Sequence, residues 1–200
     1  MPSPKCLLAI STPLGDDELL LRTAQVHEEL GRPFSIDAEL ISDNEEVSLD
    51  DLLGKNVTIS LETEEESRFF NGIITEFYQK ENIDRNACYG AVIKPWFWLL
   101  TLSENCRVFQ EKSYPDIIKS VFDDLGFSDY EDQLTGTYTP QEYVVQYNES
   151  DFNFVSRIME QEGITLKSVD ILEISPSESI DAIAARHSRE LPKSIKLFLG

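Results

Sequence analysis

The stretch that decides the fold is residues 56–94, NVTISLETEEESRFFNGIITEFYQKENIDRNACYGAVIK. Its first seven residues alternate between apolar and polar side chains, the pattern of a strand with one buried face. Two further runs, residues 69–80 and 87–95, are rich in aromatic and β-branched residues, which favour strands. The acidic run Glu64–Glu66 is typical of a hairpin tip. Residues 56–94 therefore predict three antiparallel strands joined by tight turns.

The chain just before this stretch extends the same sheet. Residues 33–41, PFSIDAELI, place four apolar side chains on one face and three polar ones on the other, so we predict a half-buried strand. Residues 48–54 predict one short helix, with a capping pair at its start and a glycine at its end. Gly72 lies inside a predicted strand and indicates a bulge or a close backbone approach. We expect residues 34–94 to curl into an antiparallel, barrel-like sheet.

Helical signals follow the sheet. Residues 95–102, PWFWLLTL, predict a buried helical turn that closes the barrel; a membrane-active patch is the alternative, and a single short run flanked by acids binds bilayers weakly. Residues 113–126 form the clearest helix, capped by Ser113 and ended by a glycine. Residues 142–147 read as a strand. Residues 150–163 predict a second helix capped by Ser150, with an apolar stripe of Phe152, Val155, Ile158 and Met159.

The composition changes near Gly163. The formal net charge is −20 over residues 1–162 and zero over residues 163–200. A capped helix beginning at Ser179 is possible in the second segment. The resulting fold class is α+β, an antiparallel β-barrel-like sheet with attached helices. We predict a β-barrel domain over 1–100, a helix-containing segment over 101–163 leading into an incomplete second barrel, and a divergent C-terminal tail over 164–200.

The charge restricts the classes of partner. A formal net charge of −20 argues against binding to a phosphate backbone, which needs clustered Lys and Arg, and against an anionic membrane surface. High solubility is the simpler interpretation, and a partner with basic patches is the sharper one. No stretch approaches the length of a membrane span, and the N-terminus lacks a usable signal peptide, so we expect synthesis and assembly in the cytoplasm.

The residues most often used in active sites form no recognisable constellation. His27 and His187 have no neighbours at metal-ligand spacing, so a surface or core histidine is the favoured interpretation of each. Pairs such as Asp16/Asp17 and Asp123/Asp124 are expected by chance in so acidic a chain. The odd set of Cys6, Cys88 and Cys106 contains no close pair and suggests free, mostly buried thiols in a reducing compartment. We expect no catalytic, cofactor-binding or metal-binding residues, and no cofactor.

Four segments carry a family resemblance. They are LLGKNVTISLE (52–62), FFNGIITEF (69–77), IKPWFWLLTLSENCRVFQEKSYPDIIKSVF (93–122) and EYVVQYNESDFNFVSRIMEQEGI (142–164). Read together, they resemble the VgrG family of type VI secretion spike proteins, from about Phe34 to Ile164. The proline and aromatic-leucine run, followed by RVFQ, a helix and VQYNESDFNFVSRIMEQEG, is the specific part of the likeness.

The resemblance implies a function and partners. In that family this region is similar to the hub protein of contractile phage tails, built from β-barrels with attached helices. Three copies form a ring that sits on a tube of stacked Hcp hexamers, and the spike is exported by the secretion machine. The resemblance therefore implies a structural component of the spike hub, between tube and needle, with no catalysis of its own.

The segment after Gly163 departs from the family pattern. The family has an aromatic strand here, whereas this chain reads TLKSVDILEISPSESID, so we expect a truncated hub followed by an unrelated tail, or a natural short variant. We expect the isolated chain to be a monomer or weak oligomer. Two other classes stay open. A stand-alone acidic binding module would be a stable monomer, and a carbohydrate-active lytic enzyme would carry paired carboxylates across a cleft.

Overall fold

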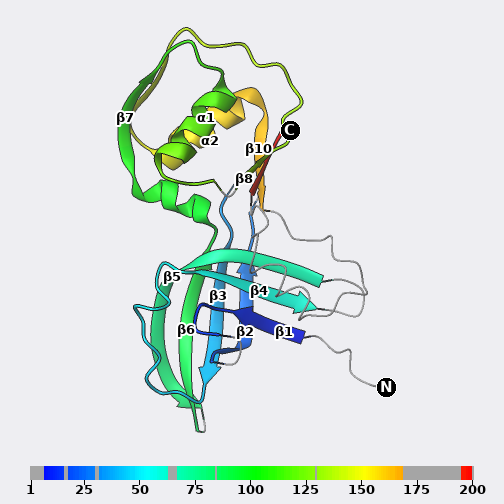
Figure 1. The fold of residues 1–200 in the computed structure, drawn as a ribbon, viewed down its shortest axis with the longest axis vertical. Helices are drawn as coiled ribbons and strands as arrows, with labels where there is room; N and C mark the ends of the chain where they lie inside the picture. The colour runs from blue at the N-terminus through cyan, green and yellow to red at the C-terminus, as the bar shows by residue number, and fades with distance from the viewer. Residues whose placement is uncertain are drawn as a thin grey trace. The chain divides into compact units, whose positions relative to one another are not determined.

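The computed structural model describes residues 7–15, 18–29, 32–62, 67–83, 85–128, 130–168 and 195–199. These residues fall into two compact units, one within Met1–Trp96 and the other built from Phe97–Val169 with the strand Ile195–Leu199. Figure 1 shows both units, and each is described here by itself. Two predicted features lie outside the described residues, namely the helix at Ser179 and the hairpin tip Glu64–Glu66. The structure does not test the expected origin of the tail.

The first unit is a single antiparallel sheet that curls into a nearly closed barrel (Figure 1). Its spatial order is β1-β4-β5-β6-β3-β2, so β1 and β2 stand at the two ends of the sheet. The predicted antiparallel barrel-like sheet is therefore confirmed, and two strands from the N-terminal region extend it. The strands are β1 Leu7–Ser11, β2 Leu20–His27, β3 Ser35–Ser42, β4 Asn56–Glu62, β5 Ser67–Ile83 and β6 Asn86–Lys94.

The core of this unit comes from the alternating residues that the sequence pattern picked out. Ile36, Ile59 and Ile93 on three different strands are almost completely inaccessible to solvent. Phe77 of β5 stacks on Tyr89 of β6 with ring centroids 5.3 Å apart. The Tyr89 hydroxyl donates to the carbonyl oxygen of Asn44 at 3.0 Å, so this buried aromatic ring keeps its polar group satisfied.

Gly72 occupies the close backbone approach that its position in β5 predicts. A Cβ atom built on Gly72 would lie 2.6 Å from the carbonyl oxygen of Lys94 and 2.8 Å from a methyl group of Ile93. The register of this strand shifts elsewhere, between Ile74 and Glu76 and again between Lys80 and Ile83. Glycine is therefore required at position 72 because β6 leaves no room for a side chain.

The prediction of a short helix over 48–54 is wrong, because these residues form a turn. The amide groups of Leu52 and Leu53 both donate to Leu49, which closes one turn. The next amide, that of Gly54, donates instead to Ile74 of β5 at 2.8 Å, and Ile74 returns the hydrogen bond to Lys55. Because a helix nucleus is costly and so few residues are available, pairing with the neighbouring strand replaces further helical turns.

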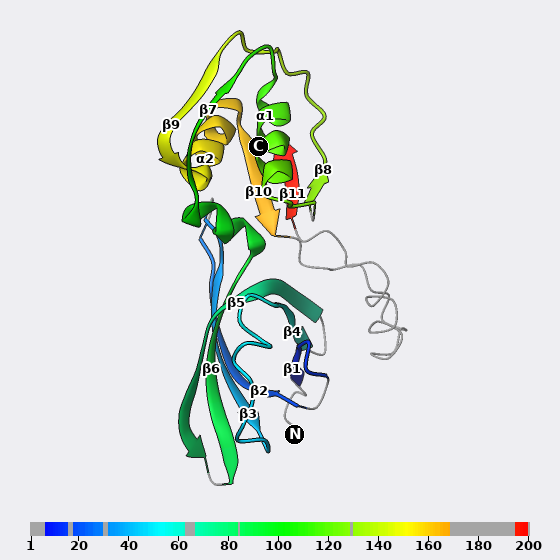
Figure 2. The ribbon, with the colours of Figure 1, turned by 60° about the vertical axis from the view of Figure 1, so that its left-hand side comes forward.

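The second unit combines two helices with two small sheets (Figure 2). β7 and β9 form an antiparallel two-stranded ribbon, and β11 lies between β10, to which it is antiparallel, and β8, to which it is parallel. The ends of the expected tail thus take part in a sheet. The elements are the 3₁₀ helix η1 Trp96–Leu102, β7 Glu104–Phe109, α1 Tyr114–Asp124, β8 Tyr130–Asp132, β9 Val144–Ser150, α2 Asp151–Glu162, β10 Ile164–Ser168 and β11 Ile195–Leu199.

Both predicted helices are confirmed with their caps. The hydroxyl oxygen of Ser113 accepts from the amide of Asp116, and that of Ser150 accepts from the amide of Asn153 at 3.1 Å. Gly163 ends α2 in the left-handed conformation, with φ of 67°.

The helical turn predicted over 95–102 forms as η1 and is buried at Trp96, Phe97 and Leu100, but Leu102 is exposed. The expectation that this turn closes the barrel is wrong, because residues from Phe97 onward belong to the second unit, where the Phe97 ring packs on the helices. None of the described helices is both long enough and apolar enough to cross a membrane.

The apolar stripe of α2 needs one correction. Phe152 is only half-buried, whereas Phe154 is fully buried and stacks on Phe109 of β7 with ring centroids 5.6 Å apart. Phe152 packs instead against Phe97 of η1, at 5.3 Å. The stripe turns toward Phe154 because the β7–β9 ribbon covers that side of the helix.

Candidate functional site

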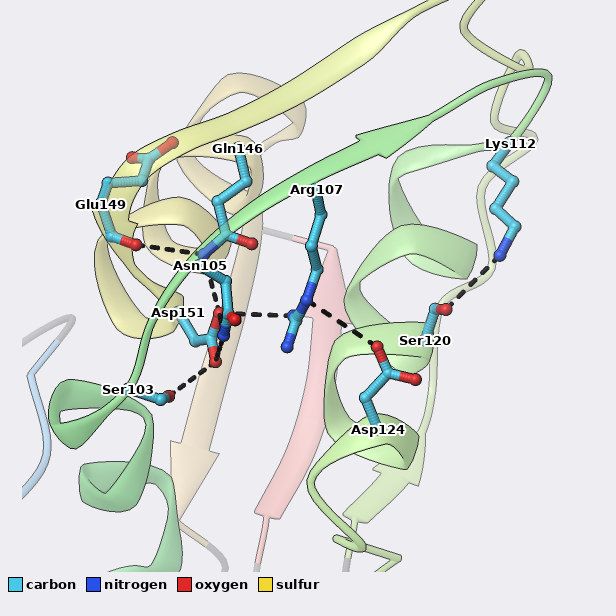
Figure 3. A network of polar contacts seen from close by, with 9 residues as sticks. All are labelled: Ser103, Asn105, Arg107, Lys112, Ser120, Asp124, Gln146, Glu149 and Asp151. Carbon is cyan, nitrogen blue, oxygen red and sulfur yellow. Dashed lines mark hydrogen bonds and ion pairs between the residues drawn. The ribbon is translucent and has the colours of Figure 1, made fainter.

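A buried carboxylate stands at the centre of the second unit (Figure 3). Asp151 is the first residue of α2 and is completely inaccessible to solvent. Its carboxylate accepts hydrogen bonds from three side chains on β9, β7 and the segment before β7. The donors are Gln146 Nε2 at 2.7 Å, Ser103 Oγ at 2.6 Å and Asn105 Nδ2 at 3.0 and 3.2 Å.

The charge of Asp151 is balanced by Arg107 of β7. Arg107 Nη1 lies 3.3 Å from the Asp151 carboxylate, at ion-pair distance but without hydrogen-bond geometry. Arg107 Nε lies 3.9 Å from Asp124, an exposed residue at the end of α1. The amide of Asp151 also donates to the carbonyl oxygen of Ser103 at 3.0 Å. The Asp151 side chain therefore ties α2 to β7, β9 and the residue that follows η1, and Arg107 extends the network to the end of α1. The helix N-terminus favours the negative charge of Asp151.

A bulge in the ribbon aims the side chains at this network. The register places Asn105 opposite Glu149 and Arg107 opposite Gln146, so β9 has one more residue than β7 between these pairs. Asn148 takes the strained position, with φ of 47°, a conformation that asparagine tolerates better than most residues. This local geometry turns Gln146 inward and leaves Tyr147 outward.

The network is suited to holding the unit together, not to reacting with a substrate. A carboxylate offers about four acceptor sites, and the three donor side chains occupy those of Asp151. Because the carboxylate is fully buried, no substrate atom can reach it within hydrogen-bond distance. Sequence reasoning missed this site, although Asp151 and the donors to its carboxylate lie within two of the segments that carry the family resemblance.

The residues singled out in the sequence are scattered. His27 is exposed on β2, with Nε2 3.5 Å from a carboxylate oxygen of Asp37. Asp123 and Asp124 are exposed at the end of α1. Within the described residues, no three His, Cys, Asp or Glu side chains are grouped so as to hold a metal ion. His187 and the pair Asp16/Asp17 lie outside the described residues.

The cysteines differ from one another. Cys88 of β6 is free and buried, as predicted, whereas Cys106 of β7 is free and exposed, so the expectation of mostly buried thiols is wrong for Cys106. Burial raises the pKa of the Cys88 thiol, and the nearby Glu39 carboxylate adds to the effect. Cys6 lies outside the described residues.

One face of the second unit is apolar and open. We call it the ribbon outer face and define it as Cys106 and Val108 of β7, Val145 and Tyr147 of β9, and Tyr143 just before β9. The exposed fraction is 78% for Tyr147, 58% for Tyr143 and 55% for Val108. Val108 and Val145 are directly opposite each other in the ribbon. The opposite side of the ribbon carries the Asp151 network, whose hydrogen bonds hold β7 and β9 in place (Figure 3).

The chain thus combines a nearly closed antiparallel barrel around an apolar core with a second unit of helices and small sheets organised around the Asp151 network. The model of the phage tail baseplate hub (GPD) family matches residues 27–170, and the chain belongs to this family. The resemblance to VgrG is confirmed as well. The chain is 49% identical over 159 residues to the type VI secretion system spike protein VgrG1b of Pseudomonas aeruginosa, and 46% identical over 188 residues to VgrG1c of the same organism.

These relatives are much longer than the chain. The matches cover 79% and 91% of this chain but only 22% and 25% of VgrG1b and VgrG1c. A match over 91% of the chain is more than residues 1–163 alone can supply, so the similarity to VgrG1c extends into the segment that we expected to be unrelated.

Solved structures share the fold. A component of the type VI secretion system from Escherichia coli, the c3393 protein, superposes with a TM-score of 0.69 at 23% identity, covering 91% of this chain and 49% of that one. A tail protein from Neisseria meningitidis has a TM-score of 0.57 at 9% identity, covering 98% of this chain and 50% of that one. At these identities the likeness concerns the fold alone.

Proposed function

We propose that the chain is a structural component of a type VI secretion spike, acting as its hub between the tube and the needle, without catalysis of its own. The observation that carries the proposal is the family match, which spans elements of both units, from the end of β2 to β10. Relatives that are 46–49% identical are spike proteins. The Asp151 network supports the same role, because its carboxylate is saturated and holds α2 against the β7–β9 ribbon.

The partners follow from the hub role. We propose that three copies form a ring on hexamers of the Hcp tube protein, that the ring assembles in the cytoplasm, and that the machine then exports it. An assembly part of this kind needs rigid surfaces and large contacts instead of reactive groups. The ribbon outer face supplies one such surface, with exposed tyrosines of the type enriched in protein interfaces.

The tube contact can be tested directly. Purified Hcp hexamers are immobilised and the chain is passed over them in a biosensor, with an unrelated hexameric ring of similar charge as the control. We expect saturable binding to the Hcp rings only. The proposed function would be contradicted if the correctly folded chain does not bind Hcp, or if it hydrolyses peptidoglycan.

A further inference from the structure

The charges around the ribbon outer face are unequally distributed. The segments 104–112 and 141–150, which contain the face, hold four acidic residues and two basic ones. Glu104, Glu111 and Glu142 are exposed. The fourth, Glu149, is half-buried and pairs with Arg157 of α2 at 2.6 Å. The border of the face is therefore acidic.

Both basic residues of these segments turn away from the face (Figure 3). Arg107 points to Asp151 and Asp124 on the inner side of the ribbon. Lys112 Nζ lies 3.4 Å from the hydroxyl oxygen of Ser120 on α1 and 5.9 Å from the centre of the Phe109 ring. An apolar centre with aromatic anchors and an acidic border thus remains on the outside.

We infer that the ribbon outer face binds a protein surface whose apolar centre is bordered by Lys and Arg side chains. A second copy of this chain fits less well. An isologous contact would set two acidic borders against each other, and a head-to-tail contact in a ring would set the acidic border against another part of a chain with a net charge of −20. A basic border on a different protein pairs with Glu104, Glu111 and Glu142 instead. The inference deepens the proposed function and rests on it, because it names the chemistry of one partner of the hub.

Two synthetic peptides test this preference. Both are disulfide-cyclised β-hairpins with the same leucine and tryptophan face, one bordered by lysines and the other by glutamates. Binding is followed by fluorescence anisotropy, and independently by protection of Cys106 from maleimide in a Cys6→Ser background. Cys106 is on the face, and the buried Cys88 is the internal reference. We expect the lysine-bordered hairpin to bind at least about tenfold more tightly at low salt and to slow the labelling of Cys106.

Variants locate the contact. Tyr147→Ser should weaken binding of the lysine-bordered hairpin at least about tenfold, because aromatic side chains dominate interface energetics. Tyr78→Ser is the matched control, since Tyr78 is 47% exposed on β5 of the first unit, outside the face, and its loss should leave binding unchanged. Circular dichroism of both variants confirms that they are folded, and Tyr147→Phe should retain most of the affinity.

Every other outcome overturns the inference. Equal binding of the two hairpins, or binding of neither, would show that the acidic border does not select a partner. Self-association of the chain that Tyr147→Ser abolishes would identify a second copy as the occupant. The Hcp biosensor experiment is separate from these measurements. If Hcp binds and the hairpins do not, only this inference fails, and if the reverse holds, the proposed function fails.

Discussion

At the scale of single residues, Asp151 connects sequence, stability and assembly. Its carboxylate lies on the inner side of the ribbon whose outer side is exposed, so the position of the exposed side chains depends on it (Figure 3). Removing one member of a buried charged network leaves the other members unsatisfied, which costs more than the net value of the interactions.

We predict that Asp151→Ala destabilises the protein by about 3–5 kcal/mol, because Arg107 and three neutral donors lose their common acceptor. Urea denaturation followed by circular dichroism measures the effect. Asp124→Asn is the matched control, since it alters a carboxylate that approaches the same guanidinium group from the exposed end of α1. It should cost less than about 1 kcal/mol. Equal effects of the two substitutions would show that the network does not stabilise the unit.

A second prediction at the residue scale concerns the loss of stability at acidic pH. Burial alone would raise the pKa of Asp132, but hydrogen bonds from Lys119 and from the amide of Leu134, with the Lys119 charge, lower this pKa below its ordinary value. The stabilisation from Asp132 is therefore present at neutral pH and is lost as the pH falls through the ordinary carboxyl range, near about 4, toward the lowered folded-state pKa.

The Asp132→Asn variant checks the sign. At pH 7 it should be less stable than the parent by up to about 1 kcal/mol, because both partners are about one-third exposed and solvent screens the pair. As the pH is lowered from 7 to 3, the difference in stability between the two proteins should shrink. Asp43→Asn, at an exposed site in the first unit, is the control. A constant difference between Asp132→Asn and the parent across this pH range would contradict the assignment.

The sequence predicted the helix that begins at Asp151 but not the burial of this residue. Ser150 as a cap and the apolar spacing of α2 are local signals, read within a few positions. The partners Ser103 and Asn105 are 48 and 46 positions away, and only the pairing of β7 with β9 brings them together. Likewise, the sequence did not predict that Cys106 is exposed while Cys88 is buried.

At the scale of elements, the strands with strict alternation were predictable and the edge strands were not. β3 to β6 carry alternating or aromatic runs, because each packs one face on the core of the first unit. β2 mixes exposed and half-buried residues as an end strand of the sheet, so its pattern is weak. At residues 49–54 the local sequence predicted a helix, but hydrogen bonds with β5 form in place of further helical turns.

Two glycines are required for different reasons, one for its backbone conformation and the other for lack of space. Gly163 ends α2 at positive φ with open space around its missing side chain, whereas Gly72 meets the backbone of β6. We predict that Gly163→Ala costs about 1–2 kcal/mol, the cost of a left-handed alanine. Gly72→Ala should cost about 3 kcal/mol or more, because β5 and β6 must separate. Urea denaturation of both variants decides between these causes, with Gly163→Asn as a milder control at the helix end. A smaller loss for Gly72→Ala than for Gly163→Ala would contradict the close approach.

At the scale of the whole molecule, charge opposes association between copies of the chain. Each chain carries a formal net charge of −20, and the face is bordered by glutamates. The matches cover only 22% and 25% of the length of the spike relatives VgrG1b and VgrG1c. Stable obligate interfaces usually bury about 2,000 Å² or more, which a five-residue face on a narrow ribbon does not supply.

We therefore predict that this chain alone is a monomer or a weak oligomer at micromolar concentration, even though we propose a trimeric hub for the complete spike. Light scattering over a range of concentrations measures the mass. Repulsion between copies is screened beyond about 8 Å at physiological ionic strength and beyond about 3 Å at 1 M salt. Any weak association should therefore increase at high salt, and Tyr147→Ser should leave that increase unchanged, because we infer that the ribbon outer face binds a different protein. A trimer mass that is independent of concentration at physiological salt would show that the barrel and helix units suffice to hold three copies together against their charge.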